Sequence, residues 1–105
     1  MARRSWRGSV GRLIRYGRAF RSAYERAGLA PGTPLGKSVA ATVRAIGEAH
    51  SLPGPGDAFT MLPPASADTW VRRVHGANLW IYFQVAEDGS VFIVSVVTSP
   101  PPVYD

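Results

Sequence analysis

Two arginines and a histidine, Arg72, Arg73 and His75, lie within four positions of one another. A guanidinium group binds phosphate oxygens through a pair of hydrogen bonds. Histidine is the most frequent general acid or base near neutral pH. The three side chains therefore predict a basic surface that suits phosphate groups, with His75 as a candidate acid or base. The same pattern is also consistent with a basic surface turn in which His75 is exposed and has no chemical role.

A further candidate for acid–base chemistry is Tyr104, which lies in a proline-rich tail beside Asp105. Burial is not expected in such a tail. The phenol could therefore act as a general acid or base on a ribose hydroxyl. The alternative is that the ring only covers part of a sheet.

An arginine block at the N-terminal end is the main feature of the composition. Eight of the twelve basic residues, all of them arginine, fall in the first 26 positions against one acid, so this segment carries a charge of +7 and the remaining 79 residues carry −2. Such a block predicts an anionic partner, most often nucleic acid. We expect four of these arginines to bind nucleic acid: Arg12, Arg15, Arg18 and Arg21. The alternative is a solvated segment that only increases solubility.

The length of 105 residues predicts one domain, which we place at residues 9–105 after a basic arm at residues 1–8. The chain has no cysteine, which excludes disulfides, thiolate nucleophiles and cysteine-based zinc sites. With only two histidines besides, we expect no metal site and no cofactor. No apolar run is long enough to cross a bilayer, so we expect a soluble, cytoplasmic protein without a membrane partner.

The segment from residue 9 to residue 27 allows two interpretations. Apolar residues recur at helical spacing, which predicts one amphipathic helix that stops at Gly28. However, Gly17 in its middle would cost roughly 1 kcal/mol relative to alanine. We therefore favour a short strand over residues 10–15 followed by a helix over residues 18–27.

A second helix is predicted to begin after Thr33, which suits an N-cap, with Pro34 in the first turn. It should end near Ala49. The rest of the chain predicts strands at residues 59–62, 70–74, 79–85 and 90–97, with hairpin turns at residues 75–78 and 87–89. The fold class is therefore α+β, with two N-terminal helices packed on one face of a small antiparallel sheet.

Alternation along the strand at residues 70–74 places Arg72 and Arg73 on opposite faces of the sheet. One of them lies on the side of the helices and the other faces outward. An outward arginine beside Trp70 and Tyr82 would form a cationic and aromatic surface that suits unstacked RNA bases. The alternative is that these aromatic rings belong to the core.

The sequence TWVRRVHGANLWIYFQVAEDGSVFIVSVV, residues 69–97, resembles the three-strand end of the RelE/ParE superfamily of bacterial toxins. The upstream helix with Phe20 and Tyr24, and the second helix before a Pro/Gly loop, are similar to the helical hairpin of that superfamily. The resemblance spans about residues 10–98 and implies a β-α-α-β-β-β order of elements.

This resemblance implies a toxin of a type II toxin–antitoxin system, with a cognate antitoxin as its partner. RelE-like members cut mRNA on the ribosome without a metal, and Arg72, Arg73 and Tyr104 match their cleavage roles. ParE-like members instead inhibit DNA gyrase. RelE-like toxins usually carry an arginine where the middle strand begins, whereas this chain has Leu79, Trp80 and Ile81. A ParE-like inhibitor or a catalytically degenerate nucleic-acid-binding module therefore stays open as the alternative.

Overall fold

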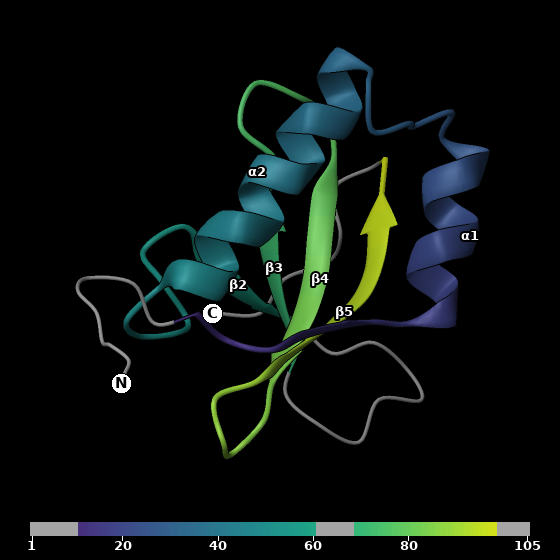
Figure 1. Cartoon of the computed structure of the whole chain (residues 1–105). Helices are drawn as coiled ribbons and strands as arrows, with labels where there is room; N and C mark the ends of the chain where they lie inside the picture. The colour runs from purple at the N-terminus through teal and green to yellow at the C-terminus, as the bar shows by residue number, and fades with distance from the viewer. Residues whose placement is uncertain (1–10, 61–68, 99–105) are drawn as a thin grey trace, which may run out of the picture.

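Strands form one sheet and helices cover one of its faces in the computed structural model, which describes residues 11–60 and 69–98 (Figure 1). The elements of this described part are β1 (Ile14–Tyr16), α1 (Arg18–Arg26), α2 (Pro34–Glu48), β2 (Asp57–Thr60), β3 (Thr69–Arg73), β4 (Trp80–Val85) and β5 (Val91–Val97). The predicted α+β class with two helices is confirmed. In the described residues the order of elements is β-α-α-β-β-β-β, with one strand more than the β-α-α-β-β-β order that the resemblance implies. The predicted arm at residues 1–8 lies outside the described residues.

The sheet is mixed, which corrects the prediction of a wholly antiparallel sheet. Its strand order is β1-β5-β4-β3-β2, and β1 pairs parallel to β5 while the other neighbours pair antiparallel. The backbone N–H of Val91 donates to the carbonyl of Leu13 at 2.8 Å, and that of Gly17 donates to Ile93 at 2.9 Å. Whether β1 pairs parallel or antiparallel depends on the edge strand that it joins. A strand of three residues has no local sequence pattern that predicts this partner.

The preferred strand-then-helix interpretation of the N-terminal segment is confirmed, with the strand later than expected, at Ile14–Tyr16. Gly17 separates strand from helix and is buried. A Cβ atom there would lie 2.8 Å from Cζ of Phe92. The same Cβ atom would lie 3.3 Å from the carbonyl oxygen of Ile93, so β5 leaves little space for a side chain at this junction.

Helix α2 begins as predicted. The amide of Gly36 donates to Oγ1 of Thr33 at 3.0 Å, so Thr33 caps the helix. The helix ends at Glu48, with Ala49 as its C-cap. Its buried apolar residues pack on the sheet, and Ile46 is fully buried.

The core lies between the helices and one sheet face. It contains Phe20 and Ala23 of α1 and the buried residues of α2, packed on these sheet residues: Ile81, Phe83, Val91, Ile93 and Val96. Val71 and Tyr82 are paired neighbours on the opposite face, and both are buried there. The strand predicted at residues 59–62 is found at Asp57–Thr60, with residues 61 and 62 outside the described part. No helix in the described ranges is long and apolar enough to cross a membrane.

Gly36 should be intolerant of a side chain. A Cβ atom built on it would lie 1.8 Å from the carbonyl oxygen of Ala30. Alanine in a helix is ordinarily favoured over glycine by about 1 kcal/mol. We nevertheless expect Gly36→Ala to lower the free energy of unfolding by about 1–3 kcal/mol, because the loop must shift to make room. Urea unfolding measures the change.

The matched control is Gly32→Ala, in the same connection, where a Cβ atom meets no other atom within 4 Å. Its unfolding midpoint should not fall. Equal midpoints for the two alanine variants would contradict the close approach at Gly36.

Candidate functional site

Three of the predicted catalytic residues line one groove. Arg72, Arg73 and His75 form one wall, and α2 forms the other wall with four small side chains: Ser38, Ala41, Thr42 and Ala45. The groove has a volume of about 360 Å³. The fourth candidate, Tyr104, lies outside the described residues. We call this cavity the β3–α2 groove.

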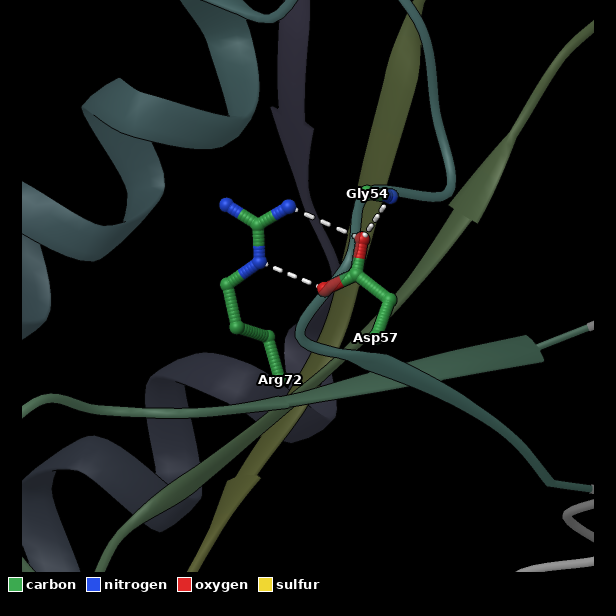
Figure 2. A network of polar contacts seen from close by, with 3 residues as sticks. All are labelled: Gly54, Asp57 and Arg72. Atoms are coloured by element: carbon green, nitrogen blue, oxygen red, sulfur yellow. Dashed lines mark hydrogen bonds and ion pairs between the residues drawn. The ribbon is translucent and has the colours of Figure 1, made fainter.

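Arg72 lies on the helix side of the sheet and forms a two-pronged ion pair with Asp57. Its Nε donates to Oδ1 at 2.5 Å and its Nη2 donates to Oδ2 at 2.8 Å (Figure 2). The amide of Gly54 also donates to Oδ2, at 2.6 Å. The Asp57 side chain is fully buried, and that of Arg72 is 19% exposed. The charge of Arg72 is therefore largely compensated, and the pair fixes the loop that precedes β2.

Arg73 lies on the opposite face, where it is exposed. Its Nε donates to the carbonyl of Ala77 at 3.1 Å, and its Nη2 donates to Oδ1 of Asn78 at 3.0 Å. The guanidinium also lies 5.6 Å from the ring centroid of Trp80. These contacts orient the group without an acidic partner, so its charge remains available for an anion.

The aromatic neighbours of the outward arginine differ from those expected. Trp70 lies on the helix side with Arg72, and Tyr82 is buried. The aromatic neighbour of Arg73 is instead Trp80, because the register of β3 and β4 pairs these two residues. That register depends on the hairpin, which the residue types alone do not determine. Burial also raises the pKa of Tyr82 above its ordinary value, which keeps its phenol protonated.

His75 is exposed in the turn after β3. The turn is closed by the amide of Val74, which donates to the carbonyl of Leu79 at 2.8 Å. His75 is one of the residues that line the β3–α2 groove. Within residues 11–60 and 69–98, no group of three or more His, Cys, Asp and Glu side chains is arranged to hold a metal ion. The chemistry that these side chains can supply is charge stabilisation and proton transfer.

Arg12, predicted to bind nucleic acid, instead holds three backbone carbonyls. Its Nε donates to Ala49 at 3.0 Å, its Nη2 to His50 at 3.1 Å and its Nη1 to Gly89 at 2.8 Å. The first two carbonyls belong to the end of α2 and the third to the β4–β5 turn. The guanidinium thus satisfies acceptors at a helix C-terminus, where a cation is also favoured by the helix dipole.

The other three arginines predicted to bind nucleic acid are exposed: Arg15 on β1, and Arg18 and Arg21 on α1. Arg15 lies opposite Phe92 of β5, which is itself 40% exposed. Arg18 and Arg21 are three positions apart and so lie near one side of α1. The structure therefore separates Arg12, which is engaged with carbonyls, from three arginines whose side chains face solvent.

Asp88 is the acidic group that acts on this cationic surface. The hydroxyl of Ser90 donates to its Oδ1 at 2.7 Å and the amide of Ser90 donates to the same atom at 2.9 Å. These bonds lower the pKa of Asp88, and the charge of Arg15 lowers it further. Asp88 is therefore ionised near neutral pH, and its charge partly offsets that of Arg15.

Asp57 is the residue of this site that the sequence did not reveal. It follows a Pro/Gly loop, where an acidic residue is typical of a turn. Its role comes from the pairing of β2 with β3, which sets Asp57 opposite Arg72. Predicting the register between β2 and β3 would have identified the ion pair of Asp57 and Arg72.

Comparisons with known proteins leave the resemblance to the RelE/ParE superfamily as a prediction. No protein-family model matches this chain, no curated protein matches it, and no solved structure matches it.

The three carbonyl contacts of Arg12 predict that its geometry matters as well as its charge. In Arg12→Lys the charge is kept, but one ammonium cannot reach the three carbonyls in the same fork. We expect the free energy of unfolding to fall by about 2 kcal/mol. Urea unfolding provides the measurement, with Arg15→Lys as the exposed control that should stay within about 0.5 kcal/mol of the parent. An equal, small effect of both changes would contradict the structural role of Arg12.

The Asp57–Arg72 pair predicts a strong coupling between two substitutions. Asp57→Asn leaves a mostly buried guanidinium without its counter-charge, so we expect a loss of about 3 kcal/mol in unfolding free energy. Adding Arg72→Met removes the stranded charge and should recover part of that loss. A double-mutant cycle measured by urea unfolding decides this. Strictly additive losses would show that the pair is not coupled.

Proposed function

We propose that this protein is a toxin of the RelE/ParE type, and that its β3–α2 groove binds RNA and cleaves it without a metal ion. The observation that carries the proposal is that Arg72, Arg73 and His75 line one groove. Among these, Arg73 and His75 are exposed, and Arg73 has no acidic partner in the described residues.

The proposed reaction is an internal transfer at the phosphorus. A base removes the proton of the ribose 2′-hydroxyl, whose oxygen attacks the adjacent phosphorus. The bond to the 5′-oxygen breaks as an acid protonates that oxygen, giving a 2′,3′-cyclic phosphate and a 5′-hydroxyl. Arg73 stabilises the negative charge on the phosphoryl oxygens. His75 transfers one of the two protons, and Tyr104 is our candidate for the other.

In this proposal Arg72 is a positioning residue. Its charge is compensated by Asp57, and it lines the groove from the helix side of the sheet, whereas the side chain of Arg73 leaves β3 on the opposite face. Arg15 and Arg18 supply additional phosphate contacts along the exposed surface of β1 and α1. The partners we propose are mRNA or the ribosome, and a cognate antitoxin that neutralises the toxin.

One observation favours a second candidate function. Arg72 is neutralised by Asp57, and β4 and β5 carry no basic residue. A groove with a single free guanidinium is consistent with binding that does not lead to cleavage. The second candidate is therefore a ParE-like inhibitor of DNA gyrase or a degenerate nucleic-acid-binding module.

The cleavage proposal is tested with purified protein and a single-stranded RNA in the presence of EDTA. Arg73→Gln should slow cleavage by about 10²–10³-fold. His75→Gln should slow it by about 10²–10⁴-fold. Both side chains are exposed, so neither substitution should unfold the protein. Arg72→Ala is a poorer test, because it strands the buried carboxylate of Asp57.

The control is Arg44→Gln, which removes an exposed charge from α2 outside the β3–α2 groove. It should cleave like the parent. RNA that is bound but stays intact would favour the nucleic-acid-binding module. Inhibition of DNA supercoiling with intact RNA would instead favour the ParE-like function. A protein that affects neither RNA nor gyrase would overturn both toxin proposals.

A further inference from the structure

A second cleft lies on the other flank of α2, between α2 and the β1–α1 segment. Figure 1 shows α1 and α2 standing apart on the sheet. Side chains of the β1–α1 segment and of α2 line a cavity of about 310 Å³ between them. The residues that define it are Tyr16, Phe20 and Tyr24 on one side and Val39, Ala40 and Val43 on the other. We call it the α1–α2 cleft.

One wall of this cleft is a row of aromatic rings. The ring centroids of Tyr16 and Phe20 are 5.1 Å apart, and those of Phe20 and Tyr24 are 5.7 Å apart. Tyr16 is 45% exposed although its ring lies at an apolar surface. The opposite wall is open because Gly36 has no side chain and Ala40 has only a methyl group. A row of rings in which Tyr16 is exposed, facing a wall of small residues, leaves room for an apolar body.

The cleft extends past Tyr16 toward the end of α2. An adjoining cavity of about 370 Å³ shares Tyr16, Ala40 and Val43 with it and continues past Ile14. The far end of that cavity is also lined by charged residues: Arg12, Arg44 and Glu48. Volumes of this size lie at the lower end of small-ligand pockets, which are roughly 300–1,000 Å³. The shape suits an elongated ligand rather than a compact one.

Arg21 is the charged residue that lines the α1–α2 cleft. Among the described residues its guanidinium has neither a hydrogen bond nor an ion pair. The first turn of α1 contains no acidic residue to offset it. A free cation beside an apolar cavity is complementary to an anionic group attached to an apolar body.

We propose that the α1–α2 cleft binds a small amphiphilic anion, an acyl or aryl chain that ends in a carboxylate or sulfonate. The anionic head group pairs with Arg21, and the apolar body lies between the aromatic row and Ala40. One charged residue, Arg21, lines this cleft, whereas two arginines and a histidine line the β3–α2 groove, so the two sites differ in their charged groups. The inference assigns Arg21 to a ligand rather than to RNA and does not depend on RNA cleavage.

The experiment uses two fluorescent probes that differ by one charged group. These are 8-anilinonaphthalene-1-sulfonate and its uncharged counterpart N-phenyl-1-naphthylamine, titrated into the full chain. Arg21→Gln should weaken binding of the sulfonate by about five- to tenfold, because one charge-assisted contact is lost. Binding of the neutral probe should not change. Decanoate should displace both probes.

The control variant is Arg26→Gln, which removes an exposed charge from the last turn of the same helix, outside the cleft. It should bind the sulfonate like the parent. Two substitutions at the exposed Ala40 locate the site. Ala40→Trp should block both probes by filling the cleft, and Ala40→Glu should weaken only the sulfonate by charge repulsion. Near-UV circular dichroism confirms that each variant keeps its native packing.

Several outcomes would overturn the proposal. One is unchanged sulfonate binding in Ala40→Trp, and another is an equal response of Arg21→Gln and Arg26→Gln. Amide NMR shifts centred on Arg73 and Trp80 would place the anion in the β3–α2 groove instead. Failure of both the sulfonate and decanoate to bind the natively folded chain would also contradict it.

Discussion

The guanidinium of Arg12 sets the position of α2, on which both clefts of this fold depend. It joins the carbonyls of Ala49 and His50 at the end of α2 to the carbonyl of Gly89 in the β4–β5 turn. The backbone amide of Arg12 also donates to Gly47 at 2.8 Å. Arg12, which precedes β1, therefore connects the edge strand of the sheet with the end of α2 and with the β4–β5 turn through hydrogen bonds. A shift of α2 would change one wall of the β3–α2 groove and one wall of the α1–α2 cleft.

Four described arginines fall into two groups according to the acceptors around them. Arg12 faces backbone carbonyls and Arg72 faces a buried carboxylate, so both groups stabilise the fold. Arg73 and Arg21 lack acidic partners in the described ranges and keep their charge for a ligand. The net charge of +5 does not predict which arginines bind groups within the protein, because charge alone does not specify the geometry of the acceptors.

Local sequence signals predicted most elements of the fold. The break at Gly17 and the cap at Thr33 both depend on neighbouring residues, and both are found as expected. The parallel pairing of β1 and the Asp57–Arg72 ion pair were not predicted. Both depend on which strands become neighbours and in what register, and this is decided by packing across the whole chain. Candidate residues could thus be named from their types, whereas their partners could not.

Small side chains on α2 explain why cavities lie on both of its flanks. Ala41 and Ala45 face the β3–α2 groove, and Gly36 and Ala40 face the α1–α2 cleft. Between these two flanks, Val39, Val43 and Ile46 anchor the helix in the core. Alanine is the best helix former, so three of these four flanking positions keep the helix stable while they leave space beside it. Leucine, an almost equally good helix former, would narrow either cavity by its larger volume. The helix therefore combines a narrow apolar stripe, which fixes it to the sheet, with two small-residue flanks, which keep the cationic groove and the apolar cleft separate.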